Sequence, residues 1–100
     1  MIEFNGKTVW ITGASSGIGK ALALKISTLK ANIVLSSRNK EELENVAKQC
    51  KGEPYILPLD LEKPKAFEKA TQLVVKKYGS IDLLINLSLI HISEPTRPNF

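Results

Sequence analysis

Short apolar runs alternate with longer segments of helical periodicity over most of the chain. The apolar runs are bounded by Gly, Pro, Asn or Asp, which predicts four strands; they cover residues 8–11, 33–35, 55–57 with Leu59, and 81–85. Between these runs, apolar residues recur every three or four positions, which predicts three helices. They cover residues 17–29, the segment from the cap residue Asn39 to Cys50, and the segment from Pro64 up to Gly79.

This strict alternation of strand and helix predicts the α/β class. The strands are continuous apolar runs, as in a parallel sheet that is covered by helices on both faces. Right-handed crossovers then lead to the N-terminal part of a Rossmann-type, doubly wound parallel sheet. We expect residues 1–86 to form this single, truncated domain, with the strand over 81–85 as an exposed apolar edge.

Composition argues against several classes of function. The 14 Lys and Arg residues exceed the 10 Asp and Glu residues by a net charge of +4, but they are spread along the chain rather than gathered into a nucleic-acid-binding stripe. The single cysteine, Cys50, allows neither an internal disulfide nor a cysteine metal site, and we expect it to be a small buried residue. With no secretion signal and no apolar stretch of ~20 residues, we expect a soluble cytoplasmic protein without membrane partners.

A glycine-rich turn, TGASSGIG over residues 12–19, joins the first predicted strand to the first predicted helix. Its first glycine permits a sharp turn, its second lets a pyrophosphate approach the main chain, and its third lets the helix pack closely. The helix N-terminus adds free N–H groups and the positive end of its dipole. The alternative is a tight turn without a ligand. The candidate phosphate-binding residues are Gly13, Ser15, Ser16, Gly17, Ile18 and Gly19.

The spacing of this turn, T-G-x-x-x-G-x-G, resembles that of the short-chain dehydrogenases/reductases. The resemblance covers residues 3–86 and extends to the ends of the three later strands, at Ser36-Ser37-Arg38, Asp60-Leu61 and the segment DLLIN over 82–86. It implies a nicotinamide dinucleotide as cofactor and hydride transfer between that cofactor and a carbonyl or alcohol substrate. Members of the family commonly assemble into oligomers through later helices, so both a homo-oligomer and a monomer stay open for the intact protein.

The tip of the second strand favours NADP over NAD. An acidic residue there would bind the ribose 2′-OH of NAD, whereas this chain has Ser37 followed by Arg38, whose guanidinium is suited to a 2′-phosphate. A solvated surface arginine is the alternative. The resemblance further implies that Asp60 and Leu61 meet the adenine and that Asn86 lies beside the cofactor. For Asp60, a plain strand-end turn residue is the alternative.

The catalytic residues of the family, a Ser and a Tyr-x-x-x-Lys pair, have no match here. Tyr55 is followed four residues later by Leu59, and Tyr78 by Asp82. We therefore expect no catalytic residue in this chain, which would hold the front half of the cofactor site and be inactive. Two other functions stay open: a non-catalytic NADP-binding sensor on the same fold, and an unrelated flavodoxin-like module whose turn holds another phosphate.

The pattern breaks after Asn86. Residues 87–97, LSLIHISEPTR, resemble an in-frame translation of the transposase adapter used to prepare DNA sequencing libraries. We expect residues 87–100 to be a non-native, unstructured tail, in which His91 has no functional role; a natural divergent C-terminus is the alternative. The underlying codons test this expectation.

Overall fold

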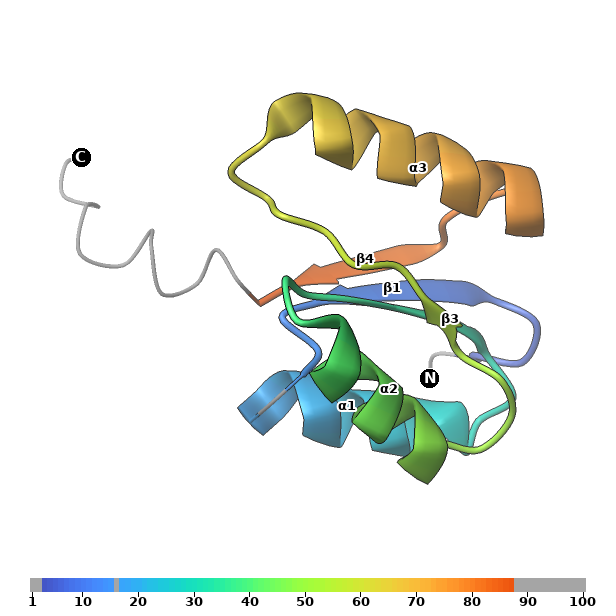
Figure 1. The fold of residues 1–100 in the computed structure, drawn as a ribbon. Helices are drawn as coiled ribbons and strands as arrows, with labels where there is room; N and C mark the ends of the chain where they lie inside the picture. The colour runs from blue at the N-terminus through green and yellow to red at the C-terminus, as the bar shows by residue number, and fades with distance from the viewer. Residues whose placement is uncertain (1–2, 16, 88–100) are drawn as a thin grey trace, which may run out of the picture.

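The computed structural model describes residues 3–15 and 17–87 as a parallel sheet with three helices (Figure 1). All three strand pairs are parallel, and the strand order is β3-β2-β1-β4. This confirms the predicted α/β class and the alternation of elements. The elements are β1 (Thr8–Thr12), α1 (Gly17–Ser27), β2 (Asn32–Ser36), α2 (Lys40–Gln49), β3 (Tyr55–Ile56), α3 (Pro64–Tyr78) and β4 (Leu83–Asn86).

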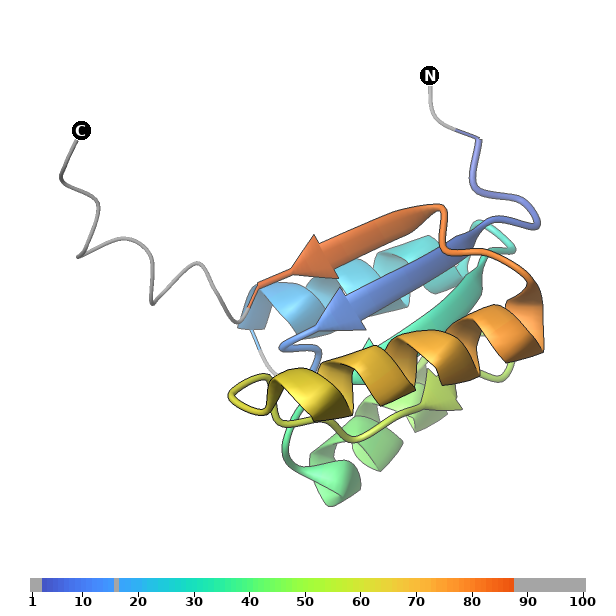
Figure 2. The ribbon, with the colours of Figure 1, turned by 90° about the horizontal axis from the view of Figure 1, so that it is seen from above.

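The sheet lies between two helical layers, with α1 and α2 on one face and α3 on the other (Figures 1 and 2). The central strand β1 is buried along its whole length, as expected where both faces are covered. Its side chains alternate between the layers: Val9 and Ile11 pack with α1 and α2, and Trp10 packs on the opposite face with α3. No helix of the described part of the chain is both long enough and apolar enough to cross a membrane.

Trp10 is the largest fully buried side chain and links three elements. Its ring stacks on Phe67 of α3, with ring centroids 5.3 Å apart and an interplanar angle of 11°. Its Nε1–H donates to Oγ of Ser36, at the end of β2, over 2.8 Å. The indole therefore packs between the sheet and α3, and its N–H, the one polar group of the ring, has the hydrogen-bond partner that a buried Trp requires.

Two helical positions differ from the periodicity prediction. Helix α1 ends at Ser27 rather than at residue 29, and Leu29 beyond it is 39% exposed. Ile18, an apolar residue at the start of the helix predicted over 17–29, is 69% exposed. The buried residues of α1 are instead Gly19, Ala23, Ile26 and Ser27. Three of these four are small, which lets the helix lie close to the sheet, and Ile26 is the one large apolar residue among them.

Two strands also differ from the prediction in their bounds. Strand β3 contains only two residues, although the N–H groups of Leu57 and Leu59 continue to donate to Leu35 O and Ser37 O, each at 2.9 Å. Pro58 lies between these two donors, where a backbone N–H would face the open edge of the sheet, so it costs no hydrogen bond to β2. Strand β4 begins at Leu83 rather than at residue 81. Just before it, the Asp82 carboxylate accepts from the N–H of Thr8 at 2.8 Å, so this residue anchors the strand.

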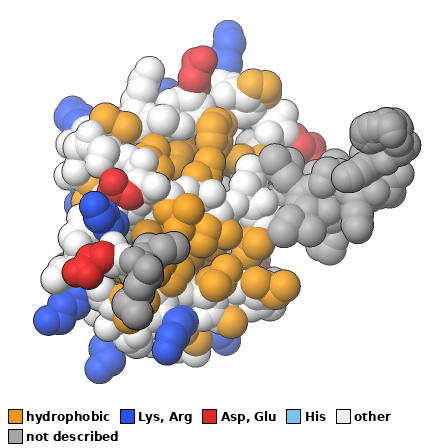
Figure 3. Space-filling view, turned by 180° about the vertical axis from the view of Figure 1, so that it is seen from behind, with side chains coloured by type: hydrophobic (Ala, Val, Ile, Leu, Met, Phe, Trp, Pro, Cys, Tyr) orange, Lys and Arg blue, Asp and Glu red, His pale blue; other side chains and the backbone are white. Residues whose placement is uncertain are grey.

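Strand β4 forms one edge of the sheet and carries exposed apolar side chains, as predicted. Leu83 and Leu84 are 37% and 40% exposed, and hydrophobic side chains gather across the middle of the molecule as seen from behind (Figure 3). Leu87, the residue directly after β4, donates its N–H to Thr12 O at 3.4 Å. The remainder of the predicted tail, residues 88–100, lies outside the described residues.

The Trp10–Ser36 hydrogen bond predicts a specific loss of stability in the variant S36A. Removing the acceptor leaves a buried indole N–H without a partner, which costs about 1–3 kcal/mol of the free energy of unfolding. Urea denaturation followed by circular dichroism measures this difference. The control variant is S80A, at an exposed position, which we expect to change the free energy by less than about 0.5 kcal/mol. Equal stability of the two variants would contradict the assigned role.

Cys50 predicts a pH dependence of stability. It is the half-buried cap residue at the end of α2, where burial raises the pKa of its thiol above 9.0 and a hydrogen bond with Ser27 partly offsets this. The folded state therefore favours the neutral thiol. That stabilisation is complete below the unfolded-state pKa and is lost as the pH rises through the folded-state pKa. Between pH 8 and 10, the wild type should lose stability faster than C50A in denaturation measurements; parallel curves would contradict this.

Candidate functional site

The carboxyl ends of three strands lie in one row. The register pairs Thr12 of β1 with Ser36 of β2 on one side and with Asn86 of β4 on the other. Every segment that leaves these strands therefore starts at the same edge of the sheet, which is where ligands bind in open parallel α/β sheets.

The glycine-rich turn that follows β1 packs tightly against the start of α1. Gly13 and Gly17 have φ values of 72° and 56°, a region that favours glycine. A Cβ added at Gly19 would collide with the Gly13 carbonyl oxygen and lie 2.9 Å from Ala14 Cα, so only glycine lets the helix start this close to the turn. The Ala14 N–H donates to Ser36 O at 3.2 Å, which ties the turn to the end of β2.

Among the described residues, none blocks the space beside Gly17 in this turn. A Cβ added at Gly17 would meet no atom within 4 Å, and the first turn of α1 contains no acidic residue. An anion can therefore approach the backbone N–H groups without a steric or charge barrier from the helix itself. Ser16, the second predicted hydroxyl donor, lies outside the described residues.

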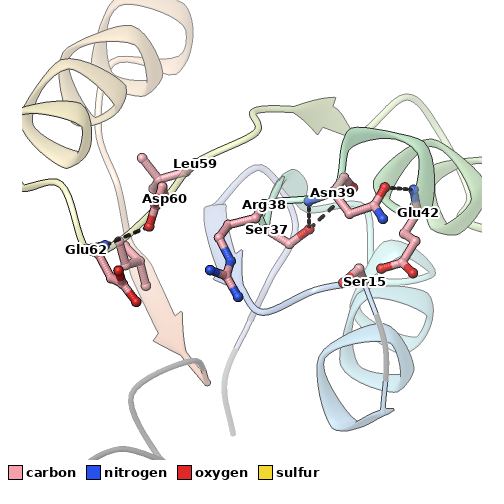
Figure 4. Close-up of a pocket in the computed structure, with 9 residues that line it drawn as sticks. Ser15, Ser37, Arg38, Asn39, Glu42, Leu59, Asp60 and Glu62 are labelled. Carbon is pink, nitrogen blue, oxygen red and sulfur yellow. Dashed lines mark hydrogen bonds between the residues drawn. The ribbon is translucent and has the colours of Figure 1, made fainter.

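Beside the turn lies a cavity of about 360 Å³. Its walls come from the turn after β1, the segment from β2 into α2, and the segment after β3 (Figure 4). Five of its nine lining residues were predicted from the sequence: Ser15, Ser37, Arg38, Asp60 and Leu61. The structure therefore brings these five predicted residues together around one cavity.

A short chain of hydrogen bonds shapes the wall between β2 and α2. The Asn39 N–H donates to Ser37 Oγ at 3.2 Å, and Asn39 Oδ1 in turn accepts from the N–H of Glu42 at 3.1 Å, which caps α2 as predicted. Arg38 stands between these two anchored residues with an exposed side chain. The hydrogen bonds of its two neighbours therefore hold the Arg38 backbone in place, and its guanidinium lies at the mouth of the cavity (Figure 4).

Asp60 lines the cavity and also forms part of a turn. Its Oδ1 accepts from the N–H of Glu62 at 3.0 Å, and its carbonyl oxygen accepts from the N–H of Lys63 at 3.0 Å. This is the arrangement of a strand-end turn residue, the alternative considered above. The carboxylate also lines the cavity, so the turn and a ligand contact are compatible.

Asn86 does not line this cavity but holds the adjacent strand end. Its Oδ1 accepts from Thr12 Oγ1 at 2.7 Å, which joins the ends of β1 and β4 by a side-chain bond in addition to the backbone ladder. The other predicted residues outside the cavity wall lie along the same edge, in the glycine-rich turn and the first turn of α1: Gly13, Gly17, Ile18 and Gly19.

Four lining residues were not identified as site residues from the sequence: Asn39, Glu42, Leu59 and Glu62. The sequence predicts Asn39 only as a helix cap and Leu59 only as part of a strand. Glu42 and Glu62 follow the predicted residues Arg38 and Asp60 by four and two positions, and this proximity was the available signal.

The two tyrosines lie away from this edge. Tyr55 begins β3 and Tyr78 ends α3, so both lie toward the amino ends of the strands. Their rings are 6.4 Å apart, and the Lys77 ammonium lies 5.3 Å and 5.5 Å from the two ring centroids. Burial and the neighbouring Tyr55 raise the pKa of Tyr78, which is opposite to the activation that proton transfer near neutral pH requires.

The chain matches known proteins over most of its length. The family model described as short chain dehydrogenase matches residues 7–97. The mouse protein named dehydrogenase/reductase SDR family member 7 is 42% identical over 91 residues, which cover 84% of this chain but 27% of the mouse protein. The chain therefore spans about a quarter of the length of this relative.

Two solved structures with bound cofactors are similar in fold and sequence. A metagenomic short-chain oxidoreductase in complex with NADP has a TM-score of 0.79 and 32% identity, covering 83% of this chain and 39% of that one. The 3-ketoacyl-(acyl-carrier-protein) reductase of Brucella melitensis complexed with NADH has a TM-score of 0.75 and 30% identity, covering 81% and 33%. By fold, by the residues at its strand ends and by these matches, the chain belongs to the short-chain dehydrogenase/reductase family of oxidoreductases.

Proposed function

We propose that this chain is the N-terminal cofactor-binding part of an NADP-dependent oxidoreductase. The intact protein would transfer a hydride between NADP(H) and a carbonyl or alcohol substrate. The observation that carries the proposal is Arg38 at the mouth of the cavity, next to Ser37 where an NAD-specific site would have a carboxylate. The two cofactor complexes among the similar structures contain different cofactors, so the choice depends on residues of this chain.

The residues present fit a dinucleotide that lies across the carboxyl edge. The pyrophosphate would bind at the open backbone in front of Gly17 and the start of α1, where N–H groups and the helix dipole favour an anion. The adenosine half would occupy the adjacent cavity, with Asp60 and Leu61 toward the adenine. The 2′-phosphate would then meet Arg38, whose guanidinium can donate two parallel hydrogen bonds. Asn86 would lie beside the nicotinamide half.

The proposed role of this chain is to bind and orient the cofactor. The bound nicotinamide supplies the hydride chemistry, while the groups here hold the phosphates and the adenosine in place. The 100 residues contain no Tyr-x-x-x-Lys pair, and the tyrosines lie away from the site edge. We therefore propose that the chain alone binds the dinucleotide without catalysing its reduction or oxidation.

The variant R38Q tests the cofactor assignment. It removes the charge but keeps much of the side-chain length, and we expect NADPH affinity to fall about ten- to hundredfold through loss of a bidentate charged contact. NADH affinity should change less than about twofold. Titration calorimetry with both cofactors measures these affinities.

The matched control for R38Q is K40Q, which removes an exposed positive charge two residues away, outside the cavity wall. Preference of the wild type for NADH would overturn the assignment, and unchanged NADPH affinity in R38Q would leave Arg38 as a solvated residue.

The variant G19A tests the turn independently of the 2′-phosphate. Its methyl group collides with backbone atoms of the turn, so α1 must move away. We expect a destabilisation of about 1–3 kcal/mol from overpacking, with NADPH and NADH affinities lowered by a similar factor. The control G52A, at a positive φ but with open space around an added Cβ, should destabilise the fold without weakening cofactor binding. Full affinity in a folded G19A variant would show that the pyrophosphate binds elsewhere.

A further inference from the structure

The wall of the cavity that would receive the 2′-phosphate carries more negative than positive side chains among the described residues. In the part of the chain that the structure describes, the wall contains one cation, Arg38, and three carboxylates, those of Glu42, Asp60 and Glu62. Asp60 is engaged in its turn through the N–H of Glu62, on the side of the cavity formed after β3. Glu42 is on the other side, in the first turn of α2, and therefore shares the wall segment that carries Arg38.

The position of Glu42 is fixed by the local structure. Its N–H is held by the Asn39 side chain at 3.1 Å, and Asn39 is in turn anchored by Ser37. The Glu42 carboxylate reaches toward Ser15, whereas the Arg38 side chain extends toward the opposite wall with Asp60 and Glu62 (Figure 4). Because Arg38 and Glu42 line the same cavity, an anionic group bound there is exposed to the charges of both side chains.

We propose that Glu42 is a specificity-determining residue: its negative charge weakens binding of the 2′-phosphate and so lowers the ratio of NADP affinity to NAD affinity at this site. This inference rests on the proposed cofactor-binding function. A dianionic phosphate is attracted by Arg38 and by the N-terminus of α2, and Glu42 weakens both attractions. The 2′-OH of NAD carries no charge and can donate a hydrogen bond to a carboxylate, so Glu42 does not penalise it.

The size of the effect depends on salt. Charges within a Debye length, about 10 Å at 0.1 M salt, interact measurably even in an exposed cavity. Removing the Glu42 charge should therefore tighten binding of a 2′-phosphate about three- to tenfold at low salt. The gain should shrink as the salt concentration rises, which distinguishes an electrostatic role from a change in cavity shape.

The helix offers a matched pair of variants. Glu41 and Glu42 both lie in the first turn of α2 and are both exposed, but only Glu42 lines the cavity. E41Q and E42Q therefore remove the same charge from the same helix terminus. Any effect through the helix dipole or through net charge is shared, and any effect through the cavity belongs to E42Q alone.

The experiment uses the 100-residue chain and two probes that differ only in the 2′-phosphate, adenosine 2′,5′-bisphosphate and adenosine 5′-monophosphate. Calorimetric titration at 50 mM and 500 mM KCl gives the affinity ratio of the two probes for each variant. Thermal melts followed by circular dichroism verify the fold of each. We expect E42Q to raise the ratio three- to tenfold at 50 mM KCl and E41Q to change it less than twofold.

The possible outcomes separate the two proposals. If E42Q and E41Q give the same ratio as the wild type while the bisphosphate binds, the role of Glu42 is overturned and the cofactor site stands. If E42Q raises affinity for both probes equally and independently of salt, Glu42 acts on cavity shape and the specificity role is overturned. If the wild type binds neither probe, the proposed cofactor-binding function fails, and the role of Glu42 fails with it.

Discussion

In-register pairing of β1 with β2 and β4 is the constraint on which the candidate site depends. Because Thr12, Ser36 and Asn86 are register partners, the three strands end side by side. Two hydrogen bonds between residues far apart in the sequence reinforce this row: Thr12 to Asn86 through side chains, and the Ala14 N–H to Ser36 O. A slip of one residue would reverse the face of every side chain in the strand and separate the turn from Arg38.

The sequence predicts most of the fold because its signals are redundant. Each strand is a continuous apolar run, and each connection contains a helix bounded by glycine, proline or a capping residue, so the parallel order follows from chain connectivity. The structure differs from the prediction where the sequence offers a single signal. The burial of α1 depends on Gly19 and Ala23, whose small side chains do not stand out in an apolar pattern, whereas Ile18 does and is exposed.

The sequence predicts those site residues that directly follow a strand, because the ends of the strands are themselves predictable. Residues directly after a strand, such as Ser37 and Arg38, could be placed at the carboxyl edge without coordinates. Glu42 could not be, because an acidic residue in a first helical turn is already explained by the helix dipole. Glu42 lines the cavity because the fold places the first turn of α2 beside the turn that follows β1, and this tertiary placement is not contained in the pattern of the helix itself.

The burial of Trp10 gives the protein an optical property. It is the only tryptophan in the chain, it is fully shielded from water, and it contacts both the layer under α3 and the end of β2. Its emission therefore arises from one apolar environment in the middle of the sheet. Loss of α3 packing or of the sheet would bring the indole into water and shift that emission to longer wavelengths, so the spectrum of the unlabelled protein reports the integrity of the framework that holds the site.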